Sequence, residues 1–110
     1  MAPGHKKMPW VRLQLPGDLY IPGTMAKALG LSAGMRVEYR RVSNDEFQLV
    51  ESLSGLSICS VDKAVSAVRV RLQAILKRHE FVMDGEGPVP VGFGPVEGEA
   101  GIHVNLRPGL

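Results

Sequence analysis

The chain has one cysteine, three widely separated histidines and no long apolar run. A single cysteine, Cys59, excludes a disulfide within the chain and a zinc site built from cysteine pairs. No apolar run approaches the roughly 18 residues needed to cross a bilayer, and Lys6 and Lys7 are not followed by the apolar stretch of a secretory signal. We therefore expect a cytoplasmic protein with no metal, no cofactor and no membrane partner.

Side chains that could carry out catalysis are also sparse. Cys59 has no histidine close to it in the sequence, and the serine-rich segment 52–60 contains no nucleophile motif. Gly85 and Gly87 do not stand between a strand and a helix, as a phosphate-binding loop would require. The 110 residues are 45% hydrophobic and 22% charged, as in one soluble folded domain. We expect a binding protein rather than an enzyme.

Charge is distributed unevenly along the chain. Residues 1–81 contain twelve Lys or Arg against seven Asp or Glu, whereas residues 82–110 contain Arg107 against four acidic residues. A basic folded part favours a polyanionic partner, and an acidic tail favours a protein partner or a solubilising role. Solvated lysines and arginines that bind nothing remain the alternative.

Period-two alternation predicts four strands and one short helix in the first half of the chain. Strands are expected over 10–15, 19–21, 35–42 and 46–51, because apolar and polar residues alternate there. Between the second and third strands, helix formers at 24–29 end at Gly30, which suits the left-handed residue that closes a helix.

Apolar residues spaced by three and four predict a long amphipathic helix over 61–81, after a linker at 53–60. Leu56 and Ile58 leave a short strand open within that linker. The helix could pack on the sheet of its own chain or, over 61–80, join dimers into tetramers. Residues 82–110 read as an acidic Gly/Pro-rich tail, partly disordered or docking on a partner. The apolar stripe consists of Val61, Val65, Val68, Leu72 and Ile75, continued by His79.

The run from Leu19 to Glu51 resembles the AbrB and MazE family of swapped-hairpin proteins. The matching pieces, in order, are Ile21-Pro22, Leu29-Gly30-Leu31, Gly34, Val37-Glu38 and Leu49-Val50. With the preceding strand, the resemblance covers about 40 of the 110 residues. It implies a homodimer in which the strands of two chains, each contributing residues 8–52, interleave into a small barrel-like body. Since one copy of the pattern is evident, two chains would be required.

The resemblance also implies a function. We expect a mainly β swapped-hairpin dimer, followed by the helix and tail, that acts as a transcriptional regulator and contacts duplex DNA through a two-fold basic surface. Two alternatives stay open: a MazE-like antitoxin whose acidic tail binds a toxin, and an adaptor that has lost DNA binding.

Several basic residues are candidates for that surface. The family usually carries basic or polar residues where this chain has Asp18, Gly23 and Ala26, so phosphate contacts are expected more firmly than base readout. The candidate DNA-binding residues are Lys6, Lys7, Arg12, Lys27, Arg36, Arg40 and Arg41. If they do not bind DNA, the helix cations Lys63, Arg69, Arg71, Lys77 and Arg78 are the next candidates.

Overall fold

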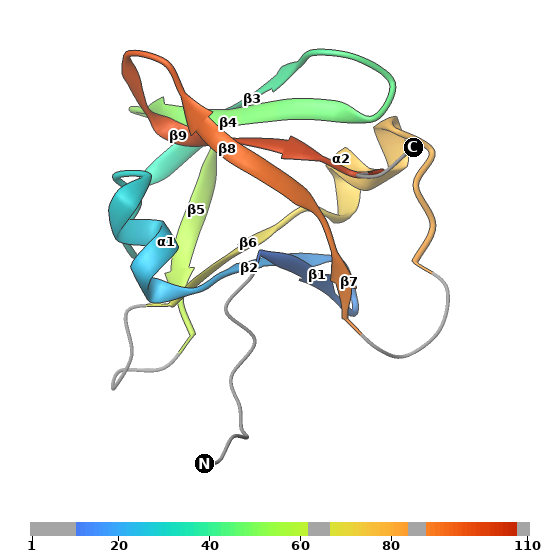
Figure 1. Ribbon diagram of the computed structural model, residues 1–110, viewed down its shortest axis with the longest axis horizontal. Helices are drawn as coiled ribbons and strands as arrows, with labels where there is room; N and C mark the ends of the chain where they lie inside the picture. Colours follow the sequence, from blue (N-terminus) through green and yellow to red (C-terminus); the bar gives the residue numbers. More distant parts are fainter. Residues whose placement is uncertain (1–10, 62–66, 84–87, 108–110) are drawn as a thin grey trace.

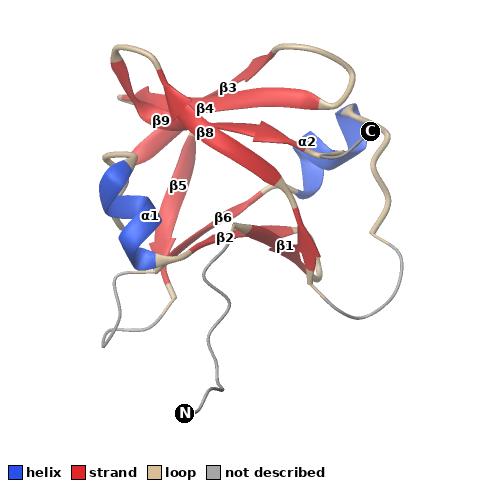
Figure 2. Cartoon of the chain, in the orientation of Figure 1, coloured by secondary structure: helices blue, strands red, loops and turns tan. Residues whose placement is uncertain are grey.

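A computed structural model describes residues 11–61, 67–83 and 88–107 (Figure 1). Within those residues the chain forms strands throughout its length and two short helices (Figure 2). The strands are β1 (Arg12–Gln14), β2 (Asp18–Ile21), β3 (Arg36–Arg41), β4 (Glu46–Ser52), β5 (Leu56–Ser60), β6 (Val68–Arg71), β7 (Val89–Pro90), β8 (Gly92–Val96) and β9 (Glu99–Asn105), and the helices are α1 (Gly23–Ala28) and α2 (Gln73–Arg78).

The strands pair antiparallel in the order β7-β1-β2-β6-β5-β3-β4-β9-β8. In Figure 1, β3, β4, β8 and β9 lie at the top, β1, β2, β6 and β7 lie at the bottom, and β5 runs between them. The two strands at the ends of this order, β7 and β8, are separated only by Val91, whose N–H donates to the carbonyl of Val11. The sheet therefore nearly closes into a barrel, which leaves little free strand edge.

The two halves of the chain repeat one arrangement. The order strand, strand, helix, strand, strand occurs as β1-β2-α1-β3-β4 and again in β5-β6-α2-β7-β8-β9, where β7 and β8, separated only by Val91, together take the place of β3. The sheet order contains the groups β1-β2-β6-β5 and β3-β4-β9-β8. Each group has one strand pair from each half, and the halves meet at its centre, where β2 pairs with β6 and β4 pairs with β9. Exchanging the two halves therefore leaves the order of the strands unchanged. The fold thus has an approximate internal two-fold.

Both helices end in the same hydrogen-bonded turn. In α1, Gly30 N–H donates to Lys27 and Leu31 N–H donates to Ala26; in α2 the same bonds run from 80 to 77 and from 81 to 76. Each turn is a Schellman motif, which needs a left-handed residue after the helix. Gly30 has φ 77° and Glu80 has φ 52°. This agreement in detail supports the structural repeat.

The core lies inside the barrel and under the two helices. Each strand sends alternate side chains inward, so Leu19 and Ile21 of β2 are buried beside Val68 and Val70 of β6. At the other end of the barrel, Phe47 of β4 is buried in the same way. The largest completely buried side chains are Phe47, Leu13, Leu19, Ile21, Leu49, Leu72 and Ile102.

The prediction of a long helix over 61–81 is wrong. Residues 62–66 lie outside the described residues, and the rest of the segment divides into strand β6 and the six-residue helix α2. Val68 fits both the helical stripe and a period of two, whereas Val70 fits only the period of two, and β-branched valines suit a strand. The pairing of β6 with both β2 and β5 stabilises the strand conformation over the helix.

The linker and the tail are also part of the barrel. Residues 56–60 form β5, and β9 lies between β4 and β8. The abundant glycine of the last segment permits close packing here: a Cβ on Gly101 would lie 2.5 Å from the carbonyl oxygen of Leu49. Gly101 is therefore required by the close approach of β9 to β4, whereas an added Cβ at Gly94 or Gly98 would meet nothing within 4 Å.

The expected fold, a swapped-hairpin dimer with an appended helix and tail, is corrected accordingly. The resemblance implied that strands of a second chain would complete the barrel-like body around β3 and β4. Within one chain, Phe47 pairs with Val104 and Leu49 pairs with Ile102, and all four side chains are buried. The second half of the chain covers the faces that a second subunit was expected to cover.

Candidate nucleic-acid interface

Three arginines line one polar hollow at the end of the barrel beside α2. The hollow has a volume of about 330 Å³. Three segments form it: the end of β3 with the turn to β4, the end of α2, and the residues after β9. Its lining residues are Arg41, Asn44, Asp45, Arg78, His79, Glu80 and Arg107. Three guanidinium groups against two carboxylates leave the hollow formally positive.

A buried histidine forms the floor of the hollow. His79 Nδ1 lies 2.7 Å from the carbonyl oxygen of Asn44, which can only accept, so this nitrogen donates. In the neutral ring Nε2 then accepts from the hydroxyl of Tyr39, also at 2.7 Å. The imidazole packs on the rings of Tyr39 and Phe47 at centroid distances of 5.8 and 5.3 Å. His79 thus holds the end of α2 against the β3–β4 turn.

The three arginines are held in different ways. Arg41 donates to the Asn44 side-chain oxygen at 2.9 Å, and Arg107 forms a 2.8 Å salt bridge with Asp45. The Arg78 guanidinium lies 5.7 Å from the centroid of the Tyr39 ring and forms no salt bridge within the described part of the chain. Arg41 and Arg78 are exposed and keep donors available for an added anion.

Glu80 places a carboxylate at the mouth of the hollow. It follows the last turn of α2, where the negative end of the helix dipole disfavours an anion. Its backbone is also left-handed, with φ 52°, a conformation that glycine adopts most easily. Glu80 therefore lowers the stability of this turn, and its negative charge weakens the binding of an anion in the hollow.

The basic residues selected from the sequence lie in different parts of the structure. Of those it describes, only Arg41 lines the hollow. Arg12 is buried, with its guanidinium 3.9 Å above the Tyr20 ring. Lys27 lies on α1, and Arg36 lies at the start of β3, where it donates to the carbonyl of Gly55 at 3.5 Å. Lys6 and Lys7 lie outside the described residues.

Arg40 is occupied by acidic partners. It forms salt bridges with Glu99 at 3.0 Å and with Glu38 at 3.2 Å. The hydrogen bond to Glu99 raises the pKa of the Arg40 guanidinium above its ordinary value, and the hydrogen bond to Glu38 adds a smaller increase. Two carboxylates beside one guanidinium make this part of β3 unfavourable for a phosphate.

No sequence pattern groups Arg78 and Arg107 with Arg41. Arg78 was among the second set of candidates, and Arg107 was noted only as the single cation of an acidic segment. That isolation among carboxylates was the one available signal for Arg107. Nothing local connects three arginines from different segments, because β9 and α2 bring them together only in the folded barrel.

Other kinds of site are not found in the residues that the structure describes. No group of three His, Cys, Asp or Glu side chains there is arranged to hold a metal ion. Neither described helix is long and apolar enough to cross a membrane.

Comparisons with protein-family models, with curated proteins and with solved structures find no match for this chain.

Proposed function

We propose that the protein binds duplex DNA through phosphate contacts centred on the arginine-lined hollow, as a transcriptional regulator in the cytoplasm. The observation that carries the proposal is the convergence of Arg41, Arg78 and Arg107 from three segments onto one hollow. The sequence resemblance of residues 19–51 to the AbrB and MazE family supports the same class of function.

The charges around the hollow favour a polyanion. Lys77 and Arg78 are adjacent and exposed on α2, and neither forms a salt bridge with a described residue. Arg41 is similarly available, whereas Arg40 and Arg69 are paired with carboxylates. Guanidinium groups bind phosphate oxygens with two parallel hydrogen bonds, which suits a backbone contact better than a lysine does.

The expected mode of binding is weakly dependent on DNA sequence. The residues lining the hollow come from turns, from the last residue of β3 and from the end of α2, and α2 has only six residues, too few to follow a major groove. Phosphate contacts position a protein on the duplex and carry no direct sequence information. Affinity should therefore depend steeply on salt.

Fluorescence anisotropy with a labelled duplex, measured across a salt series, tests the proposal. Replacing Arg41 and Arg78 together by Ala should weaken binding to all duplexes alike and flatten the log-log salt slope by about 0.9 per lost contact. Lys27→Ala combined with Arg36→Ala removes the same charge elsewhere and should change the slope less. Equal affinity and slope in the Arg41 and Arg78 double variant and in the parent would refute the assignment of DNA binding to the hollow.

A further inference from the structure

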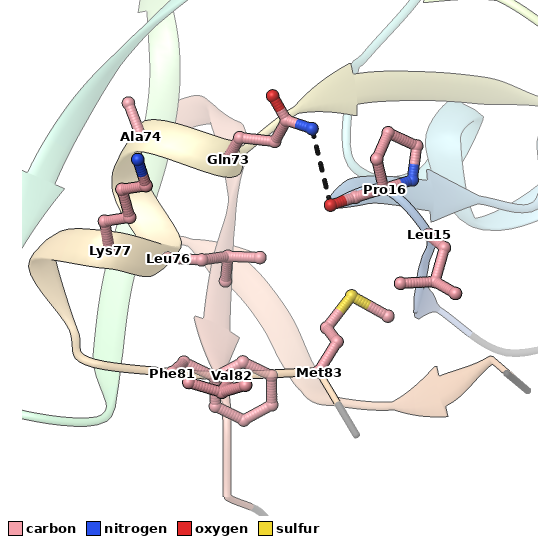
Figure 3. Close-up of a pocket in the computed structure, with 9 residues that line it drawn as sticks. All are labelled: Leu15, Pro16, Gln73, Ala74, Leu76, Lys77, Phe81, Val82 and Met83. Atoms are coloured by element: carbon pink, nitrogen blue, oxygen red, sulfur yellow. Dashed lines mark hydrogen bonds between the residues drawn. The ribbon is translucent and has the colours of Figure 1, made fainter. Parts of the chain in front are cut away.

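A second hollow, an apolar groove, also lies beside α2. Its volume is about 640 Å³, and it runs between the β1–β2 turn and α2, with the segment after α2 as its floor (Figure 3). The side chains of Leu15, Leu76 and Met83 point toward the same space. The lining residues are Leu15, Pro16, Gln73, Ala74, Leu76, Lys77, Phe81, Val82 and Met83.

The walls of the groove are held rigidly. The N–H of Leu72 donates to the carbonyl of Gly17 at 2.9 Å, and the Gln73 side chain donates to the carbonyl of Pro16 at 3.4 Å. A Cβ on Gly17 would lie 2.8 Å from Cγ of Gln73, so the turn approaches α2 more closely than a larger residue would permit. The groove is thus formed before any ligand arrives, which limits the entropy lost on binding.

The rim of the groove exposes large apolar side chains to solvent. Leu15 is 52% exposed and Val82 is 75% exposed. Such a rim would not enclose a small molecule, because small-molecule sites cover most of the ligand surface. A protein segment can cover the rim with its own neighbouring residues. Met83 adds a flexible thioether, which adapts to different apolar side chains.

The charged residues of the groove indicate which protein segment it would bind. Among the described lining residues none is acidic, and Lys77 is the one cation, with its side chain extending away from the apolar space at the margin of the groove. We propose that this groove binds a short segment of another protein that carries an apolar side chain next to an Asp or Glu. The apolar group would contact Leu15, Leu76 and Val82, and the carboxylate would pair with Lys77.

Two other occupants fit less well. A stable pairing with a second copy needs about 20 to 30 residues on each side, and nine of the described residues line this groove. An added β-strand would need a free edge, and β1, the strand nearest the groove, already pairs with β2 and with β7. Side-chain contacts rather than backbone pairing therefore define the proposed site, which does not depend on DNA binding at the hollow.

Selection of random dodecapeptides displayed on phage against the full chain tests the proposal. Enriched peptides should combine an aliphatic or aromatic residue with Asp or Glu. Binding of a synthetic copy should fall at least about tenfold in Val82→Glu and in Lys77→Glu, while Lys77→Arg should retain it. All three substitutions are at exposed positions, and thermal unfolding confirms that each variant is folded.

Matched controls come from elsewhere on the surface. Leu53 is a completely exposed apolar residue outside the groove, and Lys27 occupies the same fifth position in α1 that Lys77 occupies in α2. Leu53→Glu and Lys27→Glu should leave peptide affinity within about twofold. The proposal is overturned if no peptide is enriched, if enriched peptides lack acidic residues, or if the groove variants bind as the controls do. It is also overturned if only duplex DNA binds there.

Discussion

Glu80 occupies the left-handed position after α2 that Gly30 occupies after α1. Replacing Glu80 by glycine therefore tests both the turn and the internal repeat. A left-handed residue with a Cβ costs about 1 to 2 kcal/mol, whereas glycine adopts this conformation freely. Glycine loses about 0.5 to 1 kcal/mol through its more flexible unfolded chain. Glu80→Gly should therefore stabilise the protein by roughly 0.5 to 1 kcal/mol, or raise Tm by roughly 2 to 5 °C.

A second variant separates backbone strain from charge. Glu80→Ala also removes the carboxylate but keeps the Cβ, so the difference between the Gly and Ala variants contains the left-handed strain and the flexibility of glycine in the unfolded chain, without the charge. Urea unfolding should show Glu80→Gly to be more stable than Glu80→Ala by roughly 0.5 to 1 kcal/mol. If the two variants unfold at the same urea concentration, the reasoning about this turn is wrong.

The reciprocal change belongs at the end of α1. At Gly30 φ is 77° and a Cβ would lie 3.1 Å from Cβ of Ala100, so Gly30→Ala adds strain and a tight contact. Gly34→Ala is the control, because φ is 96° there and nothing lies within 4 Å of the added Cβ. Gly30→Ala should destabilise by about 1 to 3 kcal/mol and by more than Gly34→Ala.

Three further substitutions test contacts elsewhere in the barrel. Gly101→Ala should lower the free energy of unfolding by at least about 2 kcal/mol in urea titrations, because the new Cβ would meet the Leu49 carbonyl between β9 and β4. Tyr39→Phe removes the hydroxyl that bonds to His79 and should cost about 1 to 3 kcal/mol in the same measurement. Arg40→Ala should leave the urea midpoint unchanged, since its salt bridges are exposed, and a large shift would contradict this.

Helix α2 connects the two proposed sites. It contributes Gln73, Leu76 and Lys77 to the apolar groove and Arg78 to the polar hollow. Because the helix has only six residues, a partner in the groove would sit next to DNA bound at the hollow. Measuring peptide affinity with and without duplex shows whether the two ligands interfere or assist one another.

Local patterns predicted the first half of the chain well. Alternation placed strands where β1 to β4 form, and Gly30 marked the end of α1. These features depend on neighbouring residues, since a half-buried strand or a helix end imposes its own spacing and conformations. The prediction of one long helix over 61–81 was wrong, because Val68 belongs both to the helical stripe and to the alternation of Val and Arg that forms β6.

Of the three arginines in the proposed hollow, Arg41 belongs to the first set of candidates from the sequence and Arg78 to the second, whereas Arg107 belongs to neither. Contacts between distant segments bring the three together. The amino-acid sequence by itself determined the local elements of the first half, the single-domain size and the excess of cations before residue 82. Tertiary structure alone decided that β9 inserts beside β4, that β6 is a strand and that the second half covers the first. The reason is physical: strand pairing joins residues far apart in the chain, and its free energy can outweigh local preference.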